Sequence, residues 1–165
     1  MRLVDDLTAD QWNWRPAEGR WSIADCLEHV IRVEHRILGL IDGALREGKP
    51  EPGKQLSRPA QDVKDSIVSK GTVDRSNRRQ APDAVVPSGQ WPEAEAMMAE
   101  FRRTRDRSRE FVATTNGDLR SHFRPHGAFG EIDCYQWLVV MSLHGDRHAA
   151  QIEEVKAAAG FPKRT

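Results

Sequence analysis

An amphipathic pattern with helical spacing in residues 21–45 most constrains the fold of this chain. Its apolar side chains recur every three or four residues, so they share one face of a helix, whereas most charged side chains fall elsewhere. Ser22 and Asp25 have the spacing of a reciprocal capping box, which predicts a helix start near Ser22, and residues 46–50 contain the Gly and Pro that end it. The apolar positions are Ile23, Leu27, Val30, Ile37, Leu38 and Ile41.

Two further segments, 92–115 and 131–159, have the pattern of long helices. Pro92 suits the first turn of one, and Gly160 followed by Pro162 suits the end of the other. Acidic residues stand at helical neighbour distances from the arginines of 92–115, which indicates a solvated, salt-bridged face rather than a phosphate-binding track. Because no strand-like alternation and no internal repeat are visible, we expect an all-α antiparallel bundle that forms a single domain over residues 1–165.

The segments between these helices are less regular. Residues 1–20 contain enough apolar side chains for one short helix. Residues 50–92 contain several prolines and glycines and one weak helical patch at 60–69, which predicts a long crossover with one short helix. Such a crossover is either a lid over a functional site or a surface excursion, and the sequence leaves both open. Residues 116–130 have the composition of a polar linker.

The balance of charge limits the partners of the chain. Lys plus Arg and Asp plus Glu are both 25, so no net field of either sign recruits nucleic acid or an anionic membrane. Cys26 and Cys134 lie far apart without CxxC spacing, and no signal peptide or apolar stretch of about 18 residues is recognisable. We therefore expect a cytoplasmic protein with reduced thiols, no nucleic-acid partner and no membrane partner.

The stretch SLHGDRHAAQ places His144 and His148 one helical turn apart, in the middle of an apolar stripe of the 131–159 helix. Each unsatisfied polar group of a buried imidazole costs roughly 1–3 kcal/mol, whereas a divalent cation takes one nitrogen from each ring. Gly145 stands where HExxH metalloproteases have their glutamate, which excludes that mechanism. The pattern leaves a metal site and a core pair as equal alternatives. The rest of the stripe is Trp137, Met141, Ile152 and Val155.

His29 is the candidate for a third ligand. It lies at the border of the apolar face of the 21–45 helix, where a hydrogen-bonded histidine at the edge of the core is the simpler interpretation. Cys26, one turn before it, is expected to be a small buried apolar side chain rather than a ligand. His122 and His126 precede the last helix and are not expected to bind metal, although His126 could line the mouth of a pocket.

Three stretches of the chain together carry a family resemblance. They are LTADQWNWRPAEGRWSIADCLEHVIRVEHRI, VDRSNRRQAPDAVVPSG and PHGAFGEIDCYQWLVVMSLHGDRHAAQIEEV, and they span nearly the whole sequence. With a P…WSI…H pattern in the first and an H…RH…QI pattern in the last, the chain resembles the DinB/YfiT-like family of metal-dependent enzymes. The resemblance implies a four-helix bundle with one long crossover, and it implies that His29, His144 and His148 are the ligands of nickel or zinc.

The resemblance also concerns the start of the chain. Family members have a full helix before the LTADQW phrase, whereas only residues 1–6 precede it here. This difference implies a first helix that is short or truncated, so that either the native start lies upstream of Met1 or another copy of the chain completes the bundle. Because an incomplete helix leaves apolar faces of its neighbours uncovered, we expect a homodimer.

The ligand set that the resemblance implies points to chemistry. Three neutral donors leave part of the coordination sphere open for water or substrate, as in catalytic sites. Similar sequences include enzymes that use low-molecular-weight thiols, so the leading hypothesis is transfer of such a thiol to an electrophilic small molecule, a detoxification reaction. The alternatives are a metal-dependent hydrolase and a non-enzymatic metal-binding or stress-response protein.

Three residues near the proposed ligands are candidates for orienting them or for contacting the substrate. Asp25 lies one turn before His29, and Gln151 lies three residues after His148, so either could orient an imidazole ring or hold a substrate. Arg147 could approach an anionic substrate, although a solvated arginine is the simpler interpretation.

Overall fold

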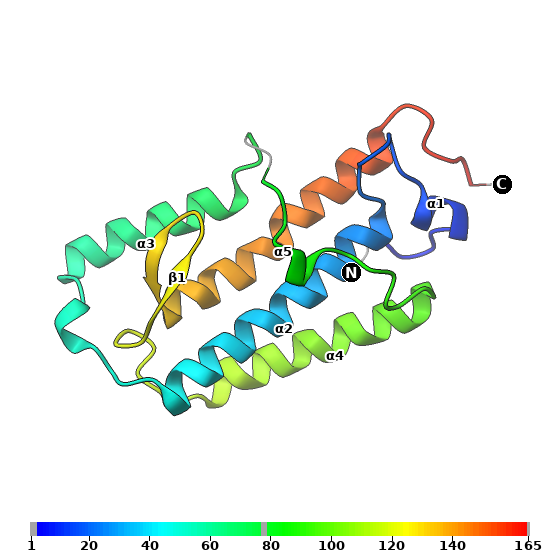
Figure 1. Ribbon diagram of the computed structural model, residues 1–165. Helices are drawn as coiled ribbons and strands as arrows, with labels where there is room; N and C mark the ends of the chain where they lie inside the picture. Colours follow the sequence, from blue (N-terminus) through cyan, green and yellow to red (C-terminus); the bar gives the residue numbers. More distant parts are fainter. Residues whose placement is uncertain (1–2, 77–78, 165) are drawn as a thin grey trace.

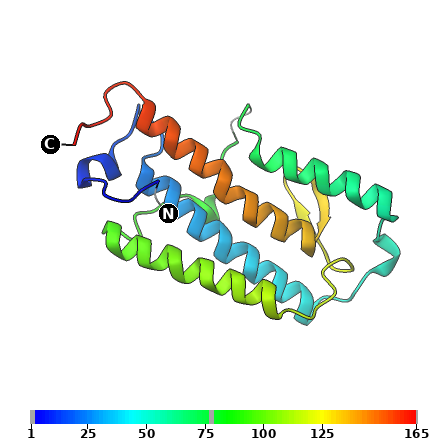
Figure 2. The same cartoon turned by 180° about the vertical axis from the view of Figure 1, so that it is seen from behind.

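The computed structural model describes residues 3–76 and 79–164, in which four long helices lie side by side. In Figures 1 and 2, α2 lies between α4 and α5, and α3 lies on the far side of α5. Consecutive long helices alternate in direction, so the contacting pair α2 and α5 is antiparallel (Figure 1). The expected all-α bundle is confirmed. The long helices are α2 (Ile23–Glu47), α3 (Arg58–Val73), α4 (Ala94–Thr114) and α5 (Cys134–Ala157).

The capping box of α2 forms as the sequence predicts. The Asp25 N–H donates to the Ser22 hydroxyl at 3.1 Å, and the Ser22 N–H donates to the Asp25 carboxylate at 2.8 Å. The helix ends where the Gly48 N–H donates to the Ala44 carbonyl oxygen at 3.0 Å. These reciprocal bonds satisfy N–H groups that a helix start otherwise leaves unpaired, so they fix the register of the helix that presents His29.

The short helix expected in residues 1–20 is α1 (Ala9–Asn13), which begins with a capping box between Thr8 and Gln11. Its Trp12 is buried in the core at the amino-terminal end of α2, and Trp14 meets Phe161 edge to face with ring centroids 5.6 Å apart. The first helix is therefore short, as predicted. No helix among residues 3–76 and 79–164 is long and apolar enough to cross a membrane.

The crossover contains more structure than the sequence pattern predicts. The patch at 60–69 is part of α3, a 16-residue helix that packs along α5 as a full member of the bundle. Its buried side is narrow and consists of Val68 and Thr72, whereas Val63 and Ile67 are 61% and 54% exposed. This mixture of buried and exposed apolar residues explains the weak periodicity. The crossover also contains the short 3-10 helices η1 (Pro52–Lys54) and η2 (Asp83–Val85).

The segment ahead of α5 is a β-hairpin rather than a linker that leads directly into the helix. Strand β1 (Phe123–His126) pairs antiparallel with β2 (Gly130–Asp133), and Gly130 has a φ of 69°, which favours glycine. Helix α5 therefore begins at Cys134 instead of near 131, and Asp133 caps it. Arg120 donates to Asp133 at 3.0 Å and to Asp65 of α3 at 2.7 Å, so the hairpin, α3 and α5 are tied together.

The buried apolar side chains form two clusters that are separated along α5 by its two histidines. One cluster surrounds the first half of α2 and includes Ile152, and the other surrounds its second half and includes Met141. His144 and His148 lie between these two positions in the sequence. The polar site is therefore bordered by packed core on both sides.

We predict that Ser22→Ala lowers the free energy of unfolding by about 1 kcal/mol, because the N–H of Asp25 loses its partner at the start of α2. Urea unfolding followed by circular dichroism measures the change. The matched control is Ser142→Ala, which makes the same chemical change at an exposed site inside α5. Because alanine has the higher helix propensity, this control is expected to be neutral or slightly stabilising. Equal losses in the two variants would contradict the prediction.

Candidate metal centre

Three imidazoles from two helices converge in the middle of the bundle. His29 of α2 lies against His144 and His148 of α5, with ring centroids 5.0 and 4.8 Å away. The Nε2 atoms of His144 and His148 are 3.2 Å apart, and one nitrogen of each of the three rings lies within 4.8 Å of those of the other two. This cluster could hold a metal ion, because a cation between the rings would reach all three nitrogens.

The packing of α2 on α5 creates this convergence. Residues 144 and 148 are one turn apart, so both rings leave α5 on the side that faces α2. His29 and His148 are only 4% and 5% exposed. The indole of Trp21 covers the rings of His29 and His148, with centroid distances of 4.7 and 6.0 Å. The cluster is therefore largely shielded from water on the side that Trp21 covers.

The backbone of the crossover determines which nitrogen of His29 faces the cluster. Nδ1 of His29 lies 2.8 Å from the carbonyl oxygen of Val85 in η2. A carbonyl oxygen only accepts hydrogen bonds, so the ring donates its proton from Nδ1 and keeps a lone pair on Nε2. A histidine in this tautomer is ready to bind a cation through Nε2.

The hydrogen bonding of His148 fits the same interpretation. Its Nδ1 is buried and has no hydrogen-bond partner among the described residues, while its Nε2 faces Nε2 of His144. In the contact between these two nitrogens, one ring has to donate a proton to the other, whereas a divalent cation would accept a lone pair from both. The residues present therefore fit a metal ion bound through the nitrogens that face one another.

Burial keeps the imidazoles of α5 neutral. Desolvation, assisted by the charge of neighbouring histidines and arginines, lowers the pKa of His144 to about 3 and that of His148 to about 2. Burial also lowers the pKa of His29, and the hydrogen bond to Val85 partly opposes this shift. Neutral rings at physiological pH are the form that metal coordination requires.

Two residues expected near the ligands make different contacts. Asp25 receives two hydrogen bonds from the Arg15 guanidinium, at 2.9 and 3.0 Å, and the partner of Nδ1 of His29 is Val85 instead. Gln151 accepts from Arg75 at 3.4 Å. Asp25 therefore supports the helix start, and Gln151 contacts the crossover.

Three other side chains discussed from the sequence also lie outside the cluster. Arg147 donates to the carbonyl oxygens of Thr72 and Asp74, so it links α5 to the end of α3. His126 packs between Phe129 and Trp137, with centroid distances of 4.6 and 4.8 Å. Cys26 is fully buried, and burial raises the pKa of its thiol to about 12. Such a thiol stays neutral, which agrees with an apolar packing role.

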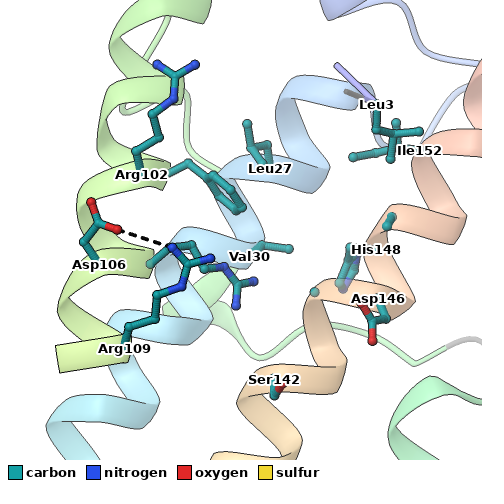
Figure 3. A pocket seen from close by; sticks show the side chains of 14 residues that line it. Leu3, Leu27, Val30, Arg102, Asp106, Arg109, Ser142, Asp146, His148 and Ile152 are labelled. Atoms are coloured by element: carbon teal, nitrogen blue, oxygen red, sulfur yellow. Dashed lines mark ion pairs between the residues drawn. The ribbon is translucent and has the colours of Figure 1, made fainter. Parts of the chain in front are cut away.

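A groove of about 750 Å³ reaches the cluster from the side of α4. In Figure 3, α4 and α5 form its walls, and Leu27 and Val30 of α2 lie between them. His148 belongs both to the lining and to the histidine cluster. The α4 wall is basic, because it carries several arginines and one acidic residue, Asp106, which forms an ion pair with Arg109. These arginines are Arg102, Arg105 and Arg109.

Two residues that support the cluster were not identified from the sequence. Val85 contributes a backbone carbonyl, which no side-chain pattern reveals. Glu28, adjacent to His29, is buried, although the helical wheel places it away from the ligands. Burial alone raises the pKa of its carboxyl, but hydrogen bonds from Ser88, Gly89 and Gln90 outweigh this and leave the pKa below its ordinary value. The sequence signal that could have indicated this role of Glu28 was a glutamate inside an amphipathic helix, together with a crossover that contains Pro and Gly.

Comparison with known proteins agrees with this geometry. A profile of the DinB superfamily matches residues 1–152, so the chain belongs to that superfamily. It is also similar to the uncharacterized protein YuaE of Bacillus subtilis (strain 168), with 23% identity over 150 residues that cover 91% of this chain and 86% of YuaE. No solved structure matches the chain significantly. The family expected from the sequence is confirmed.

The pKa values of His144 and His148 predict how stability depends on pH without metal. Both pKa values are lowered from 6.5, to about 3 and about 2. Below pH 6.5 the two histidines are therefore protonated in the unfolded chain while they stay neutral in the folded one. Stability is therefore full above pH 6.5 and falls as the pH drops, by up to about 1.4 kcal/mol per pH unit for each proton. Urea unfolding in chelator from about pH 7.5 to about pH 4.5 measures this slope.

The double variant His144→Gln/His148→Gln serves as the comparison. It should show a flatter dependence in the same pH range, because the two groups that titrate differently in the folded and unfolded states are gone. If parent and double variant have the same slope, the histidine cluster does not cause the loss of stability in acid.

Proposed function

We propose that this chain is a metal-dependent enzyme in which His29, His144 and His148 hold a divalent ion, nickel or zinc. The observation that carries the proposal is the convergence of three neutral imidazoles, two of them buried and that of His144 half-buried, with one nitrogen of each within 4.8 Å of the others. Three protein ligands are the typical number in catalytic zinc sites, where a further position is open. When bound, such an ion supplies Lewis acidity that lowers the pKa of a thiol or of water.

The proposed reaction is the transfer of a low-molecular-weight thiol to an electrophilic small molecule. The sulfur forms a bond to the electrophilic carbon, the leaving group departs with its electron pair, and the thiol proton goes to solvent. Two features of the chain support a small-molecule substrate. The groove has a volume that suits one, and its arginine-containing wall would attract carboxylate groups of a substrate or a thiol cofactor.

We predict that the purified protein, produced without an affinity tag, contains about one nickel or zinc ion per chain, because the cluster supplies three ligands. His148→Ala should reduce the metal content to near zero. The matched control is His126→Ala, which removes an imidazole outside the cluster and should leave the metal content unchanged. Elemental analysis by mass spectrometry measures all three. Equal metal contents in the parent and in His148→Ala would remove the basis of the proposal.

We predict turnover of electrophiles only when both a thiol and the metal are present. The assay combines a panel of electrophilic substrates with several low-molecular-weight thiols, before and after treatment with chelator. Chelation should reduce the rate by about 100-fold or more, because the thiol then returns to its ordinary pKa. Activity that chelator leaves unchanged rules out this mechanism.

The same assay separates the alternatives. Turnover of esters, amides or phosphates without any thiol would indicate a hydrolase. If removal of the metal unfolds the protein and no substrate reacts, the ion has a structural role. The homodimer expected from the sequence stays a prediction, which light scattering of the purified protein tests.

A further inference from the structure

A short part of the crossover is fastened to α2 by one buried carboxylate. Glu28 is only 2% exposed, and its two oxygens accept hydrogen bonds from the backbone N–H groups of Ser88 at 2.8 Å, Gly89 at 2.9 Å and Gln90 at 3.5 Å. The Ser88 hydroxyl donates to the same carboxylate at 3.1 Å. Gly89 has a φ of 74°, so the backbone curls to direct consecutive N–H groups at one anion.

Arg32, one turn after Glu28 on α2, adds a second attachment. Its guanidinium donates to the Ser88 hydroxyl at 2.8 Å and to the carbonyl oxygen of Ala84 at 3.3 Å. The same group lies 3.4 Å from the Glu28 carboxylate. We call this set of contacts between Glu28, Arg32 and residues 84–90 the crossover anchor.

The anchored segment is the one that contacts the metal cluster. Val85 lies next to Ala84 and three residues before Ser88, and its carbonyl oxygen is the partner of Nδ1 of His29. In Figure 1, η2 lies over α2, which it contacts. Glu28 and His29 are consecutive residues of one helix. The bonds of Glu28 to residues 88–90 and the bond of His29 to Val85 therefore hold residues 85–90 at both ends. The position of the Val85 carbonyl therefore depends on the anchor.

We propose that Glu28 is a positioning residue of the metal centre. Its carboxylate fixes residues 84–90 so that the Val85 carbonyl holds the proton on Nδ1 of His29, and Nε2 is then presented to the ion. The proposal rests on the proposed function, since it assigns a partner to one of the three ligands. In this arrangement the 83–90 part of the crossover is a fixed wall of the site rather than a mobile lid.

A merely structural carboxylate would stabilise the fold without affecting metal binding, and the chain contains one for comparison. Glu34 lies on the same helix, is also 2% exposed, accepts from Ser108 and pairs with Arg105 of α4 at 3.2 Å. Among the described residues, this buried, partnered glutamate has no hydrogen bond or ion pair to the crossover. Glu34→Gln is therefore the matched control for Glu28→Gln.

The experiment measures the affinity of each variant for Zn²⁺ in competition with a chromophoric chelator. Glu28→Gln should weaken binding about 10- to 100-fold, the usual effect of removing a group that orients a ligand. Glu34→Gln should stay close to the parent, even where both variants lose stability in urea. Equal losses of affinity, or no loss in Glu28→Gln, would overturn the proposal.

The ring nitrogens of His29 provide a readout that needs no metal. Nitrogen NMR of the chelated parent should show the proton of His29 on Nδ1, whereas Glu28→Gln should show a mixture of the two tautomers. An unchanged tautomer in Glu28→Gln overturns the anchor. If the parent binds no Zn²⁺ yet the tautomer shifts in the variant, the proposed function fails while the positioning role of Glu28 stands.

A second pair of variants tests the anchor from the side of the loop, in case Glu28→Gln does not fold. Gly89→Ala introduces a side chain where φ is 74° and no heavy atom lies within 4 Å, so its effect comes from the backbone. Gly130→Ala makes the same change at a φ of 69°, also in open space, but in the hairpin and away from the anchor. Weaker Zn²⁺ binding in Gly89→Ala than in Gly130→Ala supports the proposal, and equal binding contradicts it.

Discussion

The packing of α2 against α5 is the contact on which the site depends. It brings one imidazole of α2 to two imidazoles of α5 between packed apolar clusters, where His29 and His148 are buried and His144 is half-buried. Burial removes the water that would solvate these rings, so their nitrogens need other partners. His29 finds one in the Val85 carbonyl, whereas Nδ1 of His148 has none in the described chain. A cation bound through the nitrogens that face one another would give one nitrogen of each ring a partner.

The crossover supplies the hydrogen-bond partner of His29. A carbonyl oxygen can select a tautomer only if it stays in place, and residues in irregular loops usually move more than residues in helices. Here a buried, charged carboxylate accepts hydrogen bonds from consecutive backbone N–H groups of the loop. These bonds have to offset the free energy that is lost when the charge leaves water. Glu28 therefore has to keep these bonds, and it lies next to His29, whose partner Val85 belongs to the segment that Glu28 holds. Stability and metal geometry are coupled at this point.

How far the sequence predicts this arrangement depends on where each signal lies. Side-chain patterns at the ends of α2 predicted its limits, because the Ser22 capping box acts locally. The spacing of His144 and His148 predicted their shared face. The position of His29 at the border of an apolar face made it the candidate third ligand, but only the family resemblance favoured a ligand over a histidine at the edge of the core, since no local pattern tells which helices will pack. The hairpin and the full length of α3 were missed, because tertiary contacts such as Arg120 to Asp65 and Asp133 stabilise them. A backbone partner such as Val85 has no side-chain signature at all.

The two sides of the centre differ, and the difference bears on how a substrate would approach. Towards the crossover, the Val85 carbonyl and the Trp21 ring lie directly against the imidazoles, and the crossover anchor holds that wall. Towards α4, the groove reaches His148 between an apolar floor and a wall that contains Arg102, Arg105 and Arg109 (Figure 3). Guanidinium groups recognise carboxylates strongly when water is partly excluded. A molecule that reaches His148 through the groove therefore passes these arginines, of which Arg105 is paired with Glu34 and Arg109 with Asp106.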